Sequence, residues 1–355
     1  MSTVTNFNFK GDFSMKRVML AGAISLASVV ALAGCGTSSE NSTNAQTSKD
    51  KESGKLPVVR VAYMPDIHGA APLAIAQKEG YFKQQGIDVQ PVKFTSGPPE
   101  IDAMAAGQVD IAYIGPGAIF LAAEGKADIV AVDSLNVGDM ILANPKSGIK
   151  TLADLKGHTI GVPKGTSGEM ILNLALKKAG LTPSDVKIVN MDVSSEVSGF
   201  VAGHVDAVAT WNPYTSEIQK QMPNTVVLAT DRTFMPEFTF PQVWTASPSF
   251  EKSHSDLVQK FVNALAEAND WRMNHVQQAV SMTASFTGAP AASLQSQAGT
   301  TDWLSSSQIR SYMVDGTVDG WMKNLEEQFV QSGTLPKVVN PSTFVNEKYY
   351  KNISK

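Results

Sequence analysis

Residues 106–117, AGQVDIAYIGPG, have a counterpart in residues 202–214, AGHVDAVATWNPY. Each copy reads as the end of a helix, a glycine turn, a short apolar strand and a loop. The aspartates of the two copies, Asp110 and Asp206, are separated by 96 positions in the sequence. One copy in each unit of roughly a hundred residues predicts two similar lobes, each presenting a loop after the same strand.

The flanking residues repeat one order of elements. In the first half, strands predicted at 58–63 and 87–94 alternate with a helix at 70–78 and one that opens within 95–100, and a strand at 109–114 follows. In the second half, strands at 159–162 and 185–191 alternate with helices at 170–179 and from Ser194 onward, and a strand at 205–210 follows. This alternation predicts an α/β fold with a parallel sheet in each lobe.

Two segments are predicted to join the lobes. Residues 139–143 read as a strand leaving the first lobe, and residues 242–246 as a strand returning to it. Two crossings make a hinge of the kind on which clamshell proteins close around a ligand. We therefore predict a first lobe of residues 57–142 and 243–355 and a second lobe of residues 143–242, with a helical C-terminal part.

The amino-acid composition excludes several classes of function. The chain has 355 residues, of which 43% are hydrophobic and 17% charged, as expected of a globular protein with two domains. Its net charge of −4 argues against a nucleic-acid-binding protein, which usually has a basic face. With Cys35 as the single cysteine and five scattered histidines, no disulfide framework and no metal site is expected.

The N-terminal residues predict secretion. Lys16 and Arg17 precede an apolar run at 18–32, the order typical of a signal peptide. A transmembrane helix is the alternative, but the run is short and no charged stop-transfer segment follows it directly. We predict a signal peptide at 1–34, with Met15 as the true start.

The run ends in LAGC at 32–35, which resembles a bacterial lipobox and implies that Cys35 is lipidated and becomes the first mature residue. The polar residues that follow, to about position 56, predict a flexible tether. A lipid and a tether would anchor the globular body at the outer face of a membrane without spanning it.

Four further segments carry a family resemblance: residues 76–89 (AQKEGYFKQQGIDV), 151–157 (TLADLKG), 162–168 (VPKGTSG) and 203–214. Together they resemble the solute-binding proteins for nitrate, sulfonates and taurine, a group that includes NMT1/THI5-like proteins. The resemblance implies the type II periplasmic-binding-protein fold, without catalytic residues or cofactor. It also implies a monomer that captures a small solute between its lobes and delivers it to the membrane permease of an ABC importer. No Walker sequence is present, which is consistent with an ATPase on a separate chain.

Open parallel sheets bind ligands beyond the carboxyl ends of their strands, which selects the loops at 65–70, 95–98, 115–117, 164–169 and 211–214. The ligand-binding residues predicted from these loops and the returning strand are Asp66, His68, Ser96, Gly97, Gly115, Pro116, Thr166, Ser167, Glu169, Trp211, Tyr214 and Trp244. Backbone N–H groups and hydroxyls in the second and fourth loops suit the oxygens of a sulfonate, nitrate or carboxylate. Ordinary helix capping is the alternative for each loop.

The acidic residues favour a different ligand. Asp66 and Glu169 hold equivalent places in the two lobes, and Asp133 and Asp139 follow a strand predicted at 129–132. With the aromatic residues Tyr113, Trp211, Tyr214 and Trp244, they suit a guanidinium, an amine or an aminopyrimidine. This hypothesis requires Asp66 and Glu169 to approach each other across the closed cleft. Helix capping for Asp66 and a helix N-terminal position for Glu169 are the alternatives.

Two further functions are compatible with the same fold. A sensory lipoprotein that presents its ligand to a receptor kinase would have an identical binding body. A pyrimidine-synthesising enzyme shares the fold, but its cysteine-rich iron-binding pattern is absent from this sequence, as is any Ser–His–Asp or Cys–His arrangement. We therefore expect a binding protein and not an enzyme.

Overall fold

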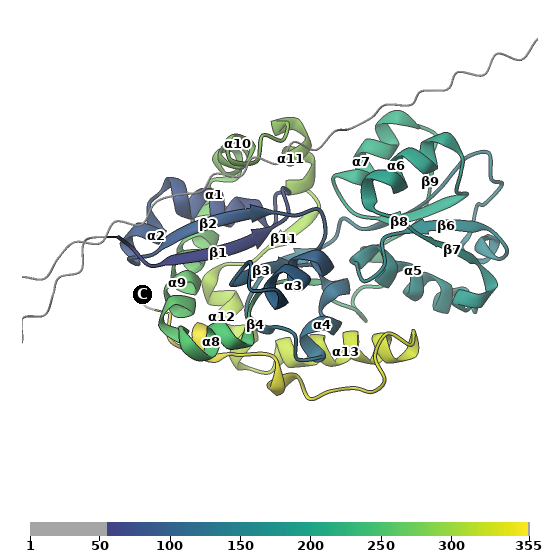
Figure 1. Ribbon diagram of the computed structural model, residues 1–355. Coiled ribbons are helices and arrows are strands. Elements are labelled where there is room, and N and C mark those ends of the chain that lie inside the picture. The colour runs from purple at the N-terminus through teal and green to yellow at the C-terminus, as the bar shows by residue number, and fades with distance from the viewer. Residues whose placement is uncertain (1–54, 354–355) are drawn as a thin grey trace, which may run out of the picture. The chain divides into compact units, whose positions relative to one another are not determined.

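The computed structural model describes residues 55–353. The predicted signal peptide, the start at Met15, the lipidated Cys35 and nearly all of the tether lie outside these residues. The described chain forms two α/β lobes, each built on its own sheet (Figure 1). The α/β class and the two-lobe architecture are as predicted.

The first lobe has a six-stranded sheet of order β11-β4-β10-β3-β1-β2. Its strands are β1 (Val58–Tyr63), β2 (Asp88–Lys93), β3 (Ile111–Ile114), β4 (Asp128–Asn136), β10 (Pro241–Ala246) and β11 (Thr301–Trp303). Strands β1, β2 and β3 are parallel, whereas β10 runs antiparallel to both β3 and β4.

The helices of the first lobe come from both ends of the described chain. They are α1 (Ala70–Lys78), α2 (Tyr81–Gln84), α3 (Gly97–Ala105), η1 (Pro116–Ala118), α4 (Phe120–Ala123), α8 (Pro248–Ser253), α9 (Ser255–Asn274), α10 (Val276–Thr287), α11 (Ala291–Ala298), α12 (Ser306–Val314), α13 (Thr317–Gln331), η5 (Pro341–Thr343) and α14 (Lys348–Lys351). The C-terminal part is helical, as predicted, and α1 packs against α9 and α10.

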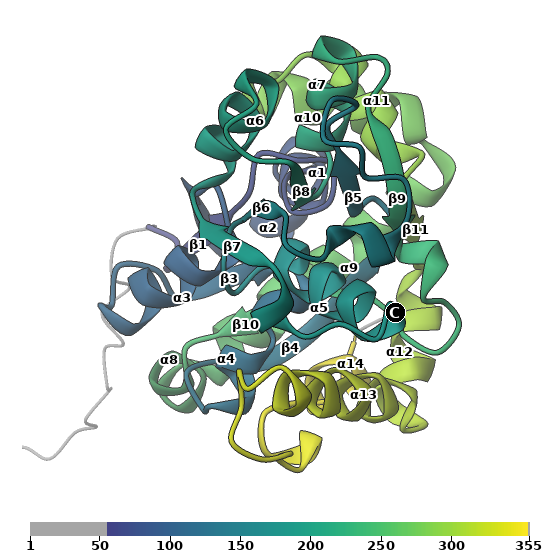
Figure 2. The same ribbon diagram turned by 90° about the vertical axis from the view of Figure 1, so that its right-hand side faces the viewer.

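The second lobe has a five-stranded sheet of order β7-β6-β8-β5-β9. Its elements are β5 (Met140–Ala143), η2 (Leu152–Leu155), β6 (Thr159–Val162), α5 (Ser167–Lys178), η3 (Pro183–Asp185), β7 (Lys187–Asn190), α6 (Val193–Ala202), β8 (Ala207–Thr210), α7 (Tyr214–Gln221), β9 (Val226–Thr230) and η4 (Asp231–Thr233). Helix α5 covers one face of this sheet, and α6 and α7 lie on the other (Figures 1 and 2).

The prediction that Met140–Ala143 leaves the first lobe as one of its strands is wrong. This segment is β5, which pairs with β8 and β9 of the second sheet. The two sheets share one order, β2-β1-β3-β10-β4 and β7-β6-β8-β5-β9, so β5 is the counterpart of β10. In each sheet the strand that arrives from the other lobe takes the fourth place. The lobe ranges 57–142 with 243–355 and 143–242 otherwise remain predictions.

The sheets are mixed rather than wholly parallel, and the crossings explain why. Strand β5 runs antiparallel to β8, and β10 runs antiparallel to β3. The parallel strands of each lobe end at the side that faces the other lobe. A strand that has just crossed from the other lobe begins at that side, so it must run in the opposite direction.

The repeated aspartates tie the third strand of each lobe to the first. Asp110 accepts a hydrogen bond from the backbone N–H of Arg60 (2.8 Å) and pairs with its guanidinium (2.5 Å). Asp206 accepts one from the backbone N–H of Thr159 (2.8 Å). In both lobes the aspartate's own N–H donates to the carbonyl of the same partner residue. These two-way contacts fix where β3 and β8 start beside β1 and β6.

A second pair of carboxyl groups, not predicted from the sequence, has the same 96-residue separation as Asp110 and Asp206. Glu100 in the first turn of α3 and Glu196 in the first turn of α6 are both fully buried. Glu100 accepts a hydrogen bond from the backbone N–H of Tyr113 in β3 (3.1 Å). Burial raises the pKa of both carboxyl groups well above the usual range, which favours their protonated forms.

Among residues 55–353, none of the helices combines the length and apolar character needed to cross a membrane. The same residues contain no group of three or more His, Cys, Asp or Glu arranged to hold a metal ion.

Replacing Asp110 with alanine is expected to lower the free energy of unfolding by about 1.5–3 kcal/mol, because charge-assisted hydrogen bonds to a half-buried partner are lost. The change Asp206→Ala should cost less, since Asp206 lacks the guanidinium partner. Urea unfolding measures both. Asp102→Ala, which removes an exposed carboxylate from α3, is the control. A cost for Asp110→Ala no larger than for this control would contradict the assigned role.

Candidate functional site

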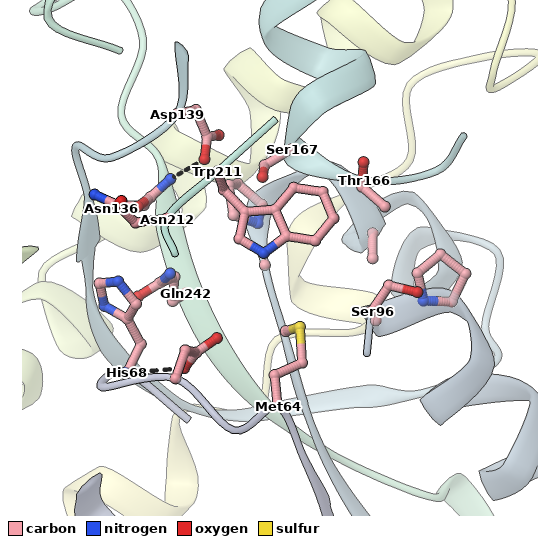
Figure 3. A pocket seen from close by; sticks show the side chains of 16 residues that line it. Met64, His68, Ser96, Asn136, Asp139, Thr166, Ser167, Trp211, Asn212 and Gln242 are labelled. Carbon is pink, nitrogen blue, oxygen red and sulfur yellow. Dashed lines mark hydrogen bonds between the residues drawn. The ribbon is translucent and has the colours of Figure 1, made fainter. Parts of the chain in front are cut away.

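The carboxyl ends of the parallel strands in the two lobes meet at a narrow cleft with a free volume of about 30 Å³ (Figure 3). The residues lining the cleft come from both lobes and from the crossings. They are Met64, Asp66, His68, Ser96, Gly97, Pro98, Gly115, Pro116, Ala118, Asn136, Asp139, Thr166, Ser167, Trp211, Asn212 and Gln242. The cleft therefore lies where the strand-end rule places a ligand site.

Nine of the twelve predicted ligand-binding residues line this cleft: Asp66, His68, Ser96, Gly97, Gly115, Pro116, Thr166, Ser167 and Trp211. The structure places Glu169, Tyr214 and Trp244 outside the lining. The prediction missed Met64, Pro98, Ala118, Asn136, Asn212 and Gln242, and it noted Asp139 only as a nearby carboxylate. Asn212 follows Trp211 directly, and Gln242 and Asp139 lie at the two crossings. Polar residues at the crossings were the sequence signal from which Asp139 and Gln242 could have been predicted.

The predicted approach of Asp66 and Glu169 is not what the structure shows. The Glu169 carboxylate accepts a hydrogen bond from the N–H of Gly165 (2.7 Å), at the turn before its own helix, and does not line the cleft. Asp66 accepts hydrogen bonds from the N–H groups of His68 (3.0 Å) and Gly69 (2.8 Å). Both carboxylates thus accept hydrogen bonds from nearby backbone N–H groups at the start of a helix. These are the alternatives that the sequence analysis gave for Asp66 and Glu169.

The predicted aromatic box is not assembled either. Trp244 is fully buried, lies against Tyr113 and Phe261 in the core, and its indole N–H points to Asp133 (3.4 Å). Tyr214 packs edge-on against Trp211, with ring centroids 5.6 Å apart. Of the four aromatic residues, only Trp211 lines the cleft. The core of the first lobe takes up Tyr113 and Trp244, and Tyr214 packs against an apolar cluster of the second lobe.

Two helix N-termini face the cleft without a side-chain cap. Helix α3 follows Ser96 and α5 follows Thr166, and neither hydroxyl accepts a hydrogen bond from the first turn. The Thr166 hydroxyl instead donates to the carbonyl of Pro163 (2.5 Å). The first N–H groups of a helix have no acceptor within the helix. Pro98 and Pro99 have no N–H, so the first turn of α3 offers only that of Gly97. The first turn of α5 has no proline, and its N–H groups are available to the oxygens of an anion.

The lobes touch where Gly117 meets the start of α5. A Cβ on Gly117 would lie 2.0 Å from the carbonyl carbon and oxygen of Thr166 and 2.3 Å from the nitrogen of Ser167. Only a glycine allows this backbone approach. Asn212 adds a second contact by donating to the hydroxyl of Thr300 in the first lobe (3.0 Å). These contacts hold the two helix N-termini on opposite sides of one cleft.

The lining carries carboxylates but no lysine or arginine. Burial raises the pKa of Asp66 to about 7, against the opposing effect of its two N–H donors. Burial, together with the charge of Arg272, lowers the pKa of His68 to about 3, so the imidazole is neutral at physiological pH. An anion in this cleft would therefore be held by N–H groups, hydroxyls and amides rather than by a fixed cation.

A second pair of carboxyl groups lies at the hinge. The backbone N–H of Asp139, on the first crossing, donates to the carboxylate of Asp231 on the second (2.8 Å). The amide of Asn136 donates to both carboxylates, at 2.6 Å and 3.4 Å. Burial raises the pKa of each carboxyl group, and for Asp231 the charge of Asp139 adds to this effect. These three side chains tie the two crossings together.

Comparison with known proteins identifies the family. Residues 68–279 match the NMT1/THI5-like family. A protein of Brucella abortus whose name describes it as a binding protein is 37% identical over 292 residues, covering 82% of this chain and 91% of its own. The chain belongs to the NMT1/THI5-like family.

Other members of this group are similar over most of the chain. A Bacillus subtilis protein named for binding aliphatic sulfonates is 30% identical over 276 residues, covering 74% of this chain and 77% of its own. The crystal structure of the periplasmic aliphatic sulphonate binding protein of Escherichia coli superposes with a TM-score of 0.65 at 24% identity, covering 82% of this chain and 92% of that one. This NMT1/THI5-like chain thus has a periplasmic-binding-protein fold, and it is a solute-binding protein rather than an enzyme.

Replacing Gly117 with alanine is expected to prevent the lobes from reaching the arrangement described here, because the new Cβ would overlap the backbone of Thr166. Affinity for a solute that stabilises the wild-type protein should fall at least about tenfold. Small-angle X-ray scattering should show no contraction of the variant when that solute is added. Gly320→Ala, whose Cβ meets nothing within 4 Å, is the control. Contraction equal to that of wild type would contradict the close approach.

Stability should fall as the pH rises through the range set by Asp66. Its pKa is about 7 in the folded protein against 3.8 as a model value. Between these values the folded state keeps a proton that the unfolded state releases, so rising pH favours unfolding. At about 1.4 kcal/mol for each pKa unit, the loss is at most about 4 kcal/mol.

Urea unfolding at pH 5 and pH 8 measures the part of this loss that falls between pH 5 and the pKa of about 7, which is about 2.8 kcal/mol. Asp66→Asn, which keeps an acceptor for the N–H groups of His68 and Gly69, should reduce the difference between the two pH values. An unchanged difference in the variant would show that Asp66 titrates normally.

Proposed function

We propose that this protein is an extracytoplasmic solute-binding lipoprotein of an ABC importer. It captures a small polar solute of the sulfonate, nitrate or taurine class between its lobes and delivers it to a membrane permease driven by a separate ATPase. The observation that best supports this ligand class is the uncapped N-terminus of α5, with Gly97 at the start of α3 on the opposite side of the cleft. The sulfonate-binding names of relatives support the same class.

The proposal that a lipid anchors the protein to the membrane is based on the sequence alone. The LAGC tetrad ending at Cys35 supports lipidation, and the polar residues after it support a tether to the outer face of the cell membrane. A monomer is proposed because the cleft is built from one chain. Loss of solute uptake on deletion of the gene, with intact chemotaxis or signalling, would favour import over a sensory role.

The acidic lining favours a second candidate, a cationic solute. Asp66 and Asp139 both line the cleft, and the lining contains no lysine or arginine. The predicted partner Glu169 is engaged elsewhere, so a cation would be held by Asp66 and Asp139 with Trp211 as the aromatic face. A guanidinium, an amine or an aminopyrimidine has the required charge.

Thermal shift with taurine, ethanesulfonate, nitrate, guanidine and an aminopyrimidine separates the candidates. We expect a sulfonate to raise the melting temperature by several degrees, because a ligand at a hundred times its dissociation constant stabilises by about 2.7 kcal/mol. Trp211→Ala should reduce the shift, since the Trp211 indole lies between the other lining side chains (Figure 3), whereas Trp271→Ala outside the cleft should not. Stabilisation by guanidine or the aminopyrimidine alone would replace the first candidate with the second.

A further inference from the structure

Gln242 is the residue through which strand β10 reaches the cleft (Figure 3). It lies opposite Ser134 of β4, at a register shift between Gln242 and Val243, and such irregularities re-aim a side chain. The amide oxygen of Gln242 accepts a hydrogen bond from the Ser134 hydroxyl at 2.8 Å. This contact engages the oxygen end of the amide and leaves its nitrogen, with two N–H donors, for a solute.

The Ser134 hydroxyl also joins Gln242 to a carboxylate behind the lining. Ser134 and Asp133 are both fully buried, and the hydroxyl oxygen lies 2.8 Å from Oδ2 of Asp133. A hydroxyl has one proton, so it donates to only one of its two acceptors at a time. Whether Gln242 receives that proton depends on the other donors that Asp133 has.

Arg272 of helix α9 is the main donor to Asp133. Its Nη2 lies 3.2 Å from Oδ2 of Asp133 and donates to the backbone carbonyl of the same residue at 2.8 Å. The guanidinium is fully buried and lies over Trp303, 5.3 Å from the ring centroid. The indole N–H of Trp244 adds a donor at 3.4 Å. With these donors, the carboxylate depends less on the Ser134 proton, which is left for Gln242.

Stability alone is a weak reason for this ion pair. The cost of taking two charges out of water offsets most of their attraction, so a buried pair contributes little net stability. Arg272 is also absent from the lining of the cleft, so its charge does not meet the solute directly. The contacts through Asp133 and Ser134 give it an indirect route to the cleft.

We propose that Arg272 is a positioning residue for solute binding, which acts through Asp133 and Ser134 to keep the N–H groups of the Gln242 amide turned towards the solute. The inference rests on the proposed function, because it assumes a solute that accepts hydrogen bonds. Without the guanidinium, Asp133 would take the Ser134 proton. The hydroxyl would then present a lone pair to Gln242, and the amide would turn its oxygen towards the oxygens of the solute.

Isothermal titration of the full chain with ethanesulfonate tests these contacts. Ser134→Ala removes a hydroxyl and no charge, and it should weaken binding about three- to tenfold, as expected of one neutral hydrogen bond. In a Gln242→Ala background the same change should have no further effect, because Ser134 acts only through Gln242. Thr245→Val is the control, since it removes a buried hydroxyl of β10 that donates to the carbonyl of Ala112 (3.1 Å), and affinity should not change.

A second pair of variants tests Arg272 itself. Arg272→Met should weaken ethanesulfonate binding by a similar factor. Adding Asp133→Asn should restore it, because the carboxylate that captures the Ser134 proton is then gone and an amide can donate to the hydroxyl. A residue that only supported the fold would not give this recovery of affinity among folded variants. If Arg272→Met does not fold, the Ser134 and Gln242 variants still test the route to the cleft.

The outcomes separate this inference from the proposed function. Unchanged affinity in Ser134→Ala, or an equal loss in the Gln242→Ala background, would overturn the inference and leave the proposed function standing. A loss in folded Arg272→Met that Asp133→Asn does not restore would overturn the role of Arg272. Absence of ethanesulfonate binding by the wild-type protein would overturn the proposed ligand class, and the inference with it.

Discussion

The close approach of Gly117 to the backbone of Thr166 is the contact on which the binding site depends. It joins a loop of the first lobe to the start of α5 in the second, with no room for a side chain between them. The uncapped N-termini of α3 and α5 face the same cleft because of this contact. A site made in this way exists only while the lobes are together, which suits a protein that must both hold a solute and release it.

The two lobes are built on one plan, and their differences carry the chemistry. Asp110 and Asp206 occupy the same structural place, as do Glu100 and Glu196, and the sheets have the same strand order. The loops after the third strand differ. The first lobe presents Gly115 to Gly117, which allow close backbone contact, and the second presents Trp211 and Asn212, which shape the cleft. The repeat thus determines the fold, while the loops determine what binds.

The sequence predicted the fold well because its signals are local. Strand and helix periodicity and the glycine turns all act within a few residues of one another. It failed where a residue's role depends on distant packing: Trp244 was predicted to bind the ligand, yet the first-lobe core buries it. Met140–Leu142 were assigned to the wrong lobe because a short apolar strand does not reveal which sheet it joins. Glu169 was assigned to the cleft by symmetry with Asp66, but its side chain turned to a nearer N–H group.

The most direct test of this account is a crystal structure of the protein with a bound sulfonate. The account predicts sulfonate oxygens within hydrogen-bond distance of the Gly97 N–H of α3 and of the first-turn N–H groups of α5, with Gly117 against Thr166 as described here. A sulfonate bound through only one lobe, or outside the cleft, would contradict it.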